Sequence, residues 1–384
     1  MVYPNFNDID ITTMVVMCYL SYEIILPQVF CLFPISPDIL SLPRKYSGKV
    51  EQLPHHNVPG SMIHLRYRGN IRGFILKNKP KKDFKNTIMV DISIKEKNIN
   101  IRLSPNTAHI CGLKSLDQIT ETYHYIEKYV KEINDESTFA SEHPDAKAEA
   151  MKYIRDNIRT IIIPGGNRLS ISHPDNFKTE STLSLDAIRI VNFFTRNIWE
   201  HSNSSFFIEE LEWLINQGCC FLGNICPMRF GYIMVNKNYN LGFLIDRHAL
   251  AKYLFNYKNF VTYYDPAANI YVKVNIPFYI TEGSNIHRKT KKKPKKDENG
   301  NIIPEEHYHR FMVYKTGSVT QTGPNLELTE IAYKEFRDAI ELFRDKIERE
   351  ALDHEEPVEI VGVNISDDIP EYTDVNTEDS YSQN

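Results

Sequence analysis

Two halves of the chain share the same order of sequence features, and this duplication limits the fold more than any other feature. The sequence KPKKD at residues 79–83 recurs at residues 293–297, an offset of 214 residues (293 − 79). Each copy follows a run of alternating apolar and polar residues, at 62–76 and 270–280, which is typical of a half-buried strand. We therefore predict two copies of one structural unit.

The end of each unit supports the duplication. Paired strands are predicted at 100–103 and 107–111 around a turn at 104–106, and at 311–314 and 318–322 around a turn near Gly317. Gly112 and Gly323 close the units, and an amphipathic helix follows each glycine. The apolar helix faces are Leu116, Ile119, Tyr123, Ile126, Val130 and Ile133, and then Ile331, Phe336, Ile340, Phe343 and Ile347.

Each unit opens with an apolar run, at 14–20 or 232–235. The predicted unit is thus a strand, a short helix, three strands and a long helix. Two unrelated α+β units are the alternative. The chain is divided into a first repeat at 1–134, a mainly helical insertion at 135–229 and a second repeat at 230–352. The insertion is predicted to hold helices at 145–163 and 183–217, and the acidic tail at 353–384 is predicted to be disordered.

Composition limits the kind of partner. The net charge is −5, so the protein is not a general polycation, and any affinity for nucleic acid must come from local patches. Six cysteines without a Cys-x-x-Cys spacing indicate a reducing, intracellular compartment. The apolar stretch at 14–35 is interrupted by Glu23, Pro27 and Gln28, so it is predicted to be a buried strand and a short helix, not a membrane span.

Candidate catalytic and metal-binding groups are weak. The pairs His55-His56 and His307/His309 lack carboxylate partners at a metal-ligand spacing. Cysteines at 219, 220 and 226 near His201 are better explained by a buried helix end, and Gly165-Gly166 is a turn that lacks the following lysine of a phosphate loop. We therefore expect no enzyme activity, no cofactor, no metal and no small-molecule substrate.

The closing segments resemble the TATA-binding protein family. Residues 312–323, MVYKTGSVTQTG, match without a gap the family pattern Leu-Ile-Phe-x-Ser-Gly-Lys-x-Val-x-Thr-Gly, and residues 101–112 are a weaker counterpart. Residues 264–266 with 270–273 resemble the family's Tyr-Glu-Pro and Leu-Ile-Tyr-Arg, and residues 58–60 before Met62 resemble its Phe-Pro-Gly. The resemblance covers roughly two thirds of the chain. The many residues with AT-rich codons and the long insertions suit a divergent relative encoded by a large DNA virus.

The resemblance implies an α+β saddle in which two pseudo-symmetric repeats share one curved antiparallel sheet, with helices on the convex face. It also implies a general transcription initiation factor that binds the minor groove of double-stranded promoter DNA. A transcription factor IIB-like protein and RNA polymerase would be its partners, without a membrane. The implied location is the host nucleus or a cytoplasmic viral factory, with packaging in the virion as a further option.

The resemblance also implies the residues that would touch DNA. On the groove face they are Val58, Leu103, Cys111, Tyr314 and Thr322. In the loops that would straddle the duplex, called stirrups in the family, they are Lys79, Lys81, Lys82, Arg288, Lys289, Lys291, Lys292, Lys293, Lys295 and Lys296. Lysine and arginine there would contact phosphates and release counterions.

The departures from the family concern its DNA-wedging phenylalanines. Their places fall on Val58, Leu103, Tyr314 and a position near Ala267 or Ala268, and none is phenylalanine. Other apolar side chains also act as wedges. The alternative function is therefore a protein-interaction scaffold that keeps the saddle but has lost TATA-specific bending.

Overall fold

The computed structural model describes residues 3–35, 59–73, 86–163, 166–171, 183–195, 229–278 and 307–349, except 95–96, 256 and 268, together with Ile286. The first repeat starts with a short turn of 3-10 helix at Phe6–Asp8. The elements that follow are β1 (Ile11–Tyr19), α1 (Leu26–Leu32), β2 (Met62–Tyr67), β3 (Asn70–Gly73), β4 (Ile88–Ile94), β5 (Lys97–Ser104), β6 (Thr107–Leu113) and the long helix α3 (Leu116–Glu142).

The second repeat has the same order of elements except that, among the described residues, it lacks a counterpart of β3 and ends in an additional short helix. Its elements are β9 (Arg229–Asn240), α7 (Arg247–Leu254), β10 (Val261–Tyr263), β11 (Tyr271–Phe278), β12 (His307–Tyr314), β13 (Ser318–Gly323), α8 (Leu326–Leu342) and the additional α9 (Arg344–Ile347). The apolar run at 14–35 contains β1 and α1, as predicted. No helix among the described residues is long and apolar enough to cross a membrane.

One antiparallel sheet joins the two repeats, in the order β10-β11-β12-β13-β9-β1-β6-β5-β4-β2-β3. From β9 outward the order is β13, β12, β11 and β10, and from β1 outward it is β6, β5, β4 and β2. The two half-sheets therefore have equivalent strand orders, apart from the additional β3. The register is also symmetric, because Thr13 pairs with Asn236 and Val15 pairs with Met234. The predicted fold class, two repeats in one open antiparallel sheet, is confirmed by this strand order.

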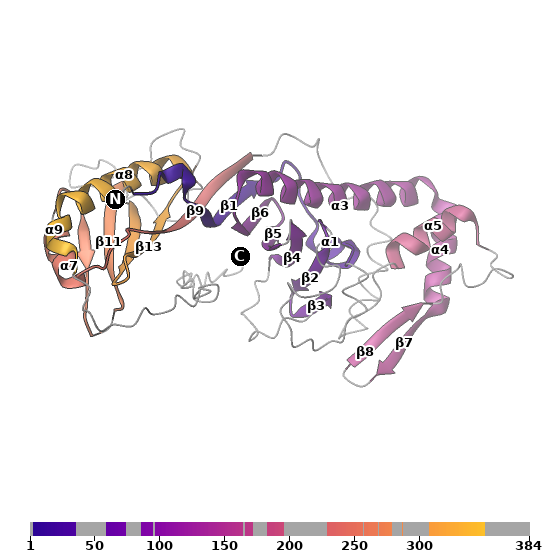
Figure 1. Ribbon diagram of the computed structural model, residues 1–384. Coiled ribbons are helices and arrows are strands. Elements are labelled where there is room, and N and C mark those ends of the chain that lie inside the picture. Colours follow the sequence, from indigo (N-terminus) through magenta and orange to yellow (C-terminus); the bar gives the residue numbers. More distant parts are fainter. Residues whose placement is uncertain are drawn as a thin grey trace, which may run out of the picture.

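The helices cover one face of the curved sheet, and within the described part of the chain no helix covers the other face (Figure 1). Helix α3 packs on β4 and β6, and α8 packs on β13. The side chain of Ser115 caps α3 by accepting a hydrogen bond from the amide of Gln118, and Asn325 caps α8 through the amide of Leu328. Gly323 ends β13 and Gly112 is the penultimate residue of β6, so a glycine at the strand end and a capping side chain precede both long helices.

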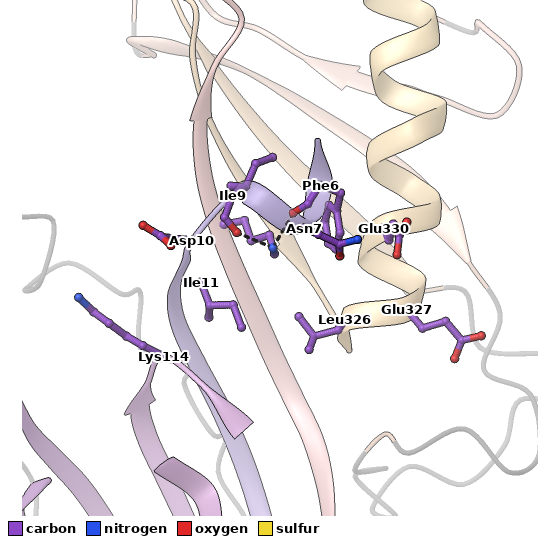
Figure 2. A pocket seen from close by; sticks show the side chains of 10 residues that line it. Phe6, Asn7, Ile9, Asp10, Ile11, Lys114, Leu326, Glu327 and Glu330 are labelled. Carbon is purple, nitrogen blue, oxygen red and sulfur yellow. Dashed lines mark hydrogen bonds between the residues drawn. The ribbon is translucent and has the colours of Figure 1, made fainter. Parts of the chain in front are cut away.

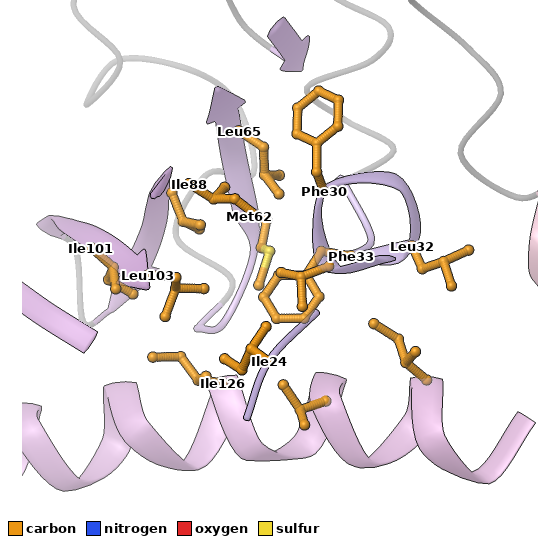
Figure 3. Close-up of a cluster of buried hydrophobic side chains, with 14 of the residues drawn as sticks. Ile24, Phe30, Leu32, Phe33, Met62, Leu65, Ile88, Ile101, Leu103 and Ile126 are labelled. Atoms are coloured by element: carbon orange, nitrogen blue, oxygen red, sulfur yellow. The ribbon is translucent and has the colours of Figure 1, made fainter. Parts of the chain in front are cut away.

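Apolar side chains between sheet and helices form the cores. In the first repeat, Ile101 and Leu103 of β5 face α3, where Ile126 packs against them (Figure 3). In the second repeat, the rings of Phe311 and Phe336 stack with centroids 4.3 Å apart. The predicted helix faces are buried, except that Leu116 and Ile331 are exposed and Phe343 is half-buried. Thr329, Ala332 and Tyr333 take the buried positions of the first turns of α8.

The insertion differs from its prediction. Helix α3 continues past the predicted boundary at residue 134, and α4 (Pro144–Asn157) follows it. Residues 158–163, predicted as the end of a helix, form β7 (Ile158–Ile163), which pairs with β8 (Gly166–Ile171). Four isoleucines in β7 explain the error, because β-branched residues favour strands. Helix α5 (Leu185–Thr195) lies within the predicted helix at 183–217, and the rest of that range lies outside the described residues.

The alignment of the two basic segments was also wrong. The range 62–76 was predicted as one strand. Its described part, 62–73, forms the β2–β3 hairpin, whose turn residues Arg68 and Gly69 have positive φ. Segment 79–83 then connects β3 to β4, whereas segment 293–297 connects β11 to β12, one strand later in its repeat. The two lysine-rich segments are therefore not equivalent. The counterpart of the β3–β4 connection in the second repeat is the β10–β11 connection, residues 264–270.

A cluster of polar side chains is buried between β12, β13 and α8. His309 is 3% exposed, and Gln321, fully buried, donates from Nε2 to the carbonyl of Thr329 at 2.7 Å. A side chain at position 323 would collide with Thr329 and His309, so glycine is needed there for packing. Burial lowers the pKa of His309 to about 4. The imidazole is thus held neutral in the folded protein.

We expect the free energy of unfolding to fall on acidification because of His309. The unfolded histidine binds a proton near pH 6.5 and the folded one only near pH 4. Stability is therefore complete above pH 6.5 and falls by up to about 3 kcal/mol towards pH 4. Urea unfolding at several pH values of the wild type and of His309→Gln checks this. An equal pH dependence in both proteins would contradict it.

Replacing Leu103 tests the assignment of β5 to the core. Leu103 is fully buried, so Leu103→Ala should lower the free energy of unfolding by roughly 2–5 kcal/mol. Tyr314→Ala, on the open face, is the matched control and should cost clearly less. Equal losses in urea unfolding would show that Leu103 is not a core residue.

Candidate nucleic-acid interface

Alternation along each strand separates a helix-covered face from an open face. On β12, His309, Phe311 and Val313 are buried beneath α8, and the residues between them are exposed or half-buried. We use the term open face for the strand positions that alternate with the core positions. It includes Arg66, Met89, Asp91, Asn98, Asn100, Arg102, Ser104, Thr107, His109, Cys111, Thr13, Val15, Met17, Tyr19, Arg229, Met234, Asn236, Asn238, Tyr263, Tyr271, Lys273, Asn275, Tyr308, Arg310, Met312, Tyr314, Ser318, Thr320 and Thr322.

Three of the five predicted groove residues lie on the open face. Cys111 pairs with Asn100, and Thr322 pairs with Arg310, at equivalent places in the two hairpins. Tyr314 lies beside Tyr271, with ring centroids 5.7 Å apart. Their positions agree with a groove-facing role, which stays a prediction.

Leu103 was assigned to the wrong face. It is fully buried against α3, whereas its sequence counterpart Tyr314 is on the open face. The cause is the turn. Leu103 pairs with Ala108 across a hairpin whose turn residues are Pro105 and Asn106. In the second hairpin Val313 takes that place, opposite Val319, and the turn is one residue longer. A shift of one residue moves a side chain to the other face of a strand, so Ser104 is the true counterpart of Tyr314.

The remaining predicted contacts lie outside the described residues. These are Val58 and all the basic residues predicted for the stirrups, at 79–82 and 288–296. Ile286, just before the second basic segment, pairs with Tyr232 of β9. The chain therefore reaches the middle of the sheet immediately before this segment.

The two faces of the sheet carry opposite charge. The strand positions of the open face hold the basic residues Arg66, Arg102, Arg229, Lys273 and Arg310, and one acidic residue, Asp91. The carboxylate of Asp91 accepts a hydrogen bond from Asn100 at 2.8 Å. Helices α3 and α8 together carry twelve acidic and four basic residues. A polyanion would therefore be attracted to the open face and repelled by the helices.

Several open-face residues were not predicted from the sequence. Tyr263 and Tyr308 are 55% and 41% exposed, and Arg310 lies between Tyr308 and Met312 on the same strand. Ile270, predicted to point inward with Val272, is instead 71% exposed in the β10–β11 connection. The alternation of β12 was visible in the sequence and would have identified Tyr308 and Arg310. Ile270 could not be placed, because it precedes the strand.

The thiol and imidazole groups of the open face are not arranged for metal binding or nucleophilic chemistry. Burial raises the pKa of the Cys111 thiol to about 11, and Sγ lies 3.5 Å from Nδ1 of His109. Within the described ranges, no three histidine, cysteine or acidic side chains lie close enough together to hold a metal. The pair His55-His56 and the cysteines at 219, 220 and 226 lie outside these ranges.

A pocket of about 360 Å³ lies on the helix side, where the two repeats meet (Figure 2). Its wall includes Phe6, Ile9 and Leu326. Buried Lys237 donates from Nζ to the carbonyls of Phe6 at 2.9 Å and Ile9 at 2.6 Å, and its ammonium lies 4.1 Å from the Phe6 ring centroid. These contacts fix the N-terminal segment across the junction of the repeats, and the lysine has a structural role.

Comparison with solved structures finds a similarity to the Methanococcus jannaschii TBP, with a TM-score of 0.33 and 11% sequence identity. The alignment covers 88% of this chain and 99% of that chain. No protein-family model and no curated protein sequence matches the chain.

Proposed function

We propose that the protein binds double-stranded DNA across the open face of its saddle and acts as a TBP-like transcription initiation factor. The observation that carries the proposal is the opposite charge of the two faces. Basic residues gather on the open face of a protein whose net charge is −5, and the acidic residues gather on α3 and α8. Cations at such a face contact phosphates and release counterions, which favours binding.

The chemistry of the open face also fits the minor groove. Polar uncharged side chains, among them Thr13, Asn236 and Thr322, lie at its centre beside the apolar Val15 and Met234. The minor groove offers mainly hydrogen-bond acceptors at A·T pairs, and the amide of asparagine and the hydroxyl of threonine can donate to them. Strands that read the minor groove are an established docking geometry. The acidic helix side would remain available to a transcription factor IIB-like protein and RNA polymerase.

Two residues at the second repeat's rim are placed to act as wedges. Ile270 is 71% exposed at the end of the β10–β11 connection, the counterpart of the predicted first stirrup. Tyr314 lies on the neighbouring strand β12, where it pairs with Tyr271 of β11. Apolar side chains that enter a base step unstack it and bend the duplex. This pair replaces the predicted pair of Leu103 and Tyr314.

Neutralising two open-face cations should weaken DNA binding and flatten its salt dependence. Lys273→Gln with Arg310→Gln should lower the slope of log K against log salt concentration by close to one for each lost phosphate contact. Fluorescence anisotropy with a labelled duplex over a range of salt concentrations measures both effects. The matched control, Lys334→Gln with Arg337→Gln on α8, should leave affinity and slope unchanged.

Two results would contradict this proposal. Equal losses in the open-face and the α8 variants would show that the charge acts without a defined binding face. A wild-type protein without salt-dependent duplex binding would favour the protein-interaction scaffold instead.

Removing the wedge pair should separate bending from binding. Ile270→Ala with Tyr314→Ala should abolish most of the bend of a duplex that carries fluorescent dyes at both ends, because no side chain then unstacks the step. Weak, salt-sensitive binding should persist, since the cations remain. Leu342→Ala, which removes a 63% exposed side chain from α8, is the control. An unchanged energy-transfer signal in the wedge variant would assign bending to other residues.

A further inference from the structure

The two halves of the open face are equivalent in topology but differ in chemistry. The second repeat presents four tyrosines on β10, β11 and β12, namely Tyr263, Tyr271, Tyr308 and Tyr314. The equivalent strands of the first repeat, β2, β4 and β5, present no aromatic ring other than imidazole there, and Asn98, Asn100 and Ser104 occupy β5. The fold requires no such difference, because these positions are outside both cores.

The tyrosines and two cations lie on the same face of three adjacent strands. Tyr271 pairs with Tyr314, Lys273 with Met312 and Asn275 with Arg310, so three rows of open-face side chains cross β11 and β12. Tyr263 lies on the edge strand β10, and its ring centroid is 5.3 Å from the Lys273 ammonium. The strand positions of this half hold no acidic residue. We call Tyr263, Tyr271, Lys273, Tyr308, Arg310 and Tyr314 the tyrosine layer.

Flat aromatic rings interleaved with cations suit the faces of nucleobases. Each base stacked on an aromatic side chain contributes about 1–3 kcal/mol, whatever its sequence, and adjacent cations hold the phosphates. A base within an intact duplex is stacked on its neighbours and offers only its edges in the grooves. The tyrosine layer therefore has more ring surface than paired DNA can cover.

We propose that the tyrosine layer stacks unpaired bases, so that the protein holds duplex DNA next to a short opened segment. The inference rests on the proposed binding of DNA at the open face and names the form of DNA. The polar first repeat contacts paired DNA through its amides and arginines. The second repeat contacts the opened strand. This division of roles orients the protein along the DNA.

Binding to matched DNA substrates tests the inference. Labelled DNA of one sequence is prepared as an intact duplex and as a duplex with a short mismatched bubble, and affinities are compared by fluorescence anisotropy. The wild type should bind the bubble about tenfold tighter or more. Tyr263→Ala with Tyr308→Ala should lower bubble affinity far more than duplex affinity and so remove the preference for the bubble, because stacking on unpaired bases is what these rings supply.

Two control variants separate the ring from other effects. Tyr263→Phe with Tyr308→Phe keeps the aromatic faces and should keep the preference for the bubble. Phe255→Ala removes a ring that is 60% exposed at the end of α7, on the helix side, and should change neither affinity. The fluorescent base 2-aminopurine, placed in the bubble, should be quenched by stacking in the wild type and the phenylalanine variant but not in the alanine variant.

Each failure has a distinct meaning. Equal affinity for bubble and duplex, or an equal loss for both in the alanine variant, would overturn the stacking inference and leave duplex binding intact. Tighter binding to an RNA of the same sequence would overturn it in favour of RNA recognition. Failure to bind any DNA would overturn the proposed function itself.

Discussion

The antiparallel pairing of β1 with β9 is the interaction on which the rest of the structure depends. It turns two separate half-sheets into one, and it does so with the symmetric contacts Thr13–Asn236 and Val15–Met234. Both strands would otherwise expose unpaired backbone groups along one edge, which is unfavourable and prone to non-specific pairing. The N-terminal segment reinforces the junction, because Lys237 holds the carbonyls of Phe6 and Ile9.

Joining the half-sheets in this way also decides which surface can recognise a ligand. Both long helices pack on the same side, so no helix among the described residues covers the opposite face of the sheet (Figure 1). Acidic residues outnumber basic ones on α3 and α8, and basic residues outnumber acidic ones at the strand positions of the open face. A protein of negative net charge thus has one face suited to a polyanion. The two repeats then supply different side chains to that face. The outer three strands of the second repeat present four tyrosines there, and the equivalent strands of the first repeat present none.

One residue in a turn shows how small a change sets a side chain's role. The hairpin of the first repeat turns through two residues and that of the second through three. A gapless comparison makes Leu103 equivalent to Tyr314, yet one is in the core and the other on the surface. Because side chains alternate along a strand, one added turn residue moves a side chain from the core face to the open face. The basic segments KPKKD show the same limit, since similar sequences connect different pairs of strands.

The sequence by itself determined the duplication, the strand pairs around 104–106 and Gly317, and the two long helices that follow Gly112 and Gly323. These depend on local signals, namely alternation, turn residues and capping by Ser115 and Asn325. It also placed Cys111 and Thr322 at equivalent sites. Only the tertiary structure decided that Ile270 is exposed, that Leu103 is buried and that Tyr263, Lys273 and Arg310 lie in one layer. The physical reason is that face and neighbour depend on strand register, and register is fixed by pairing between segments far apart in the chain.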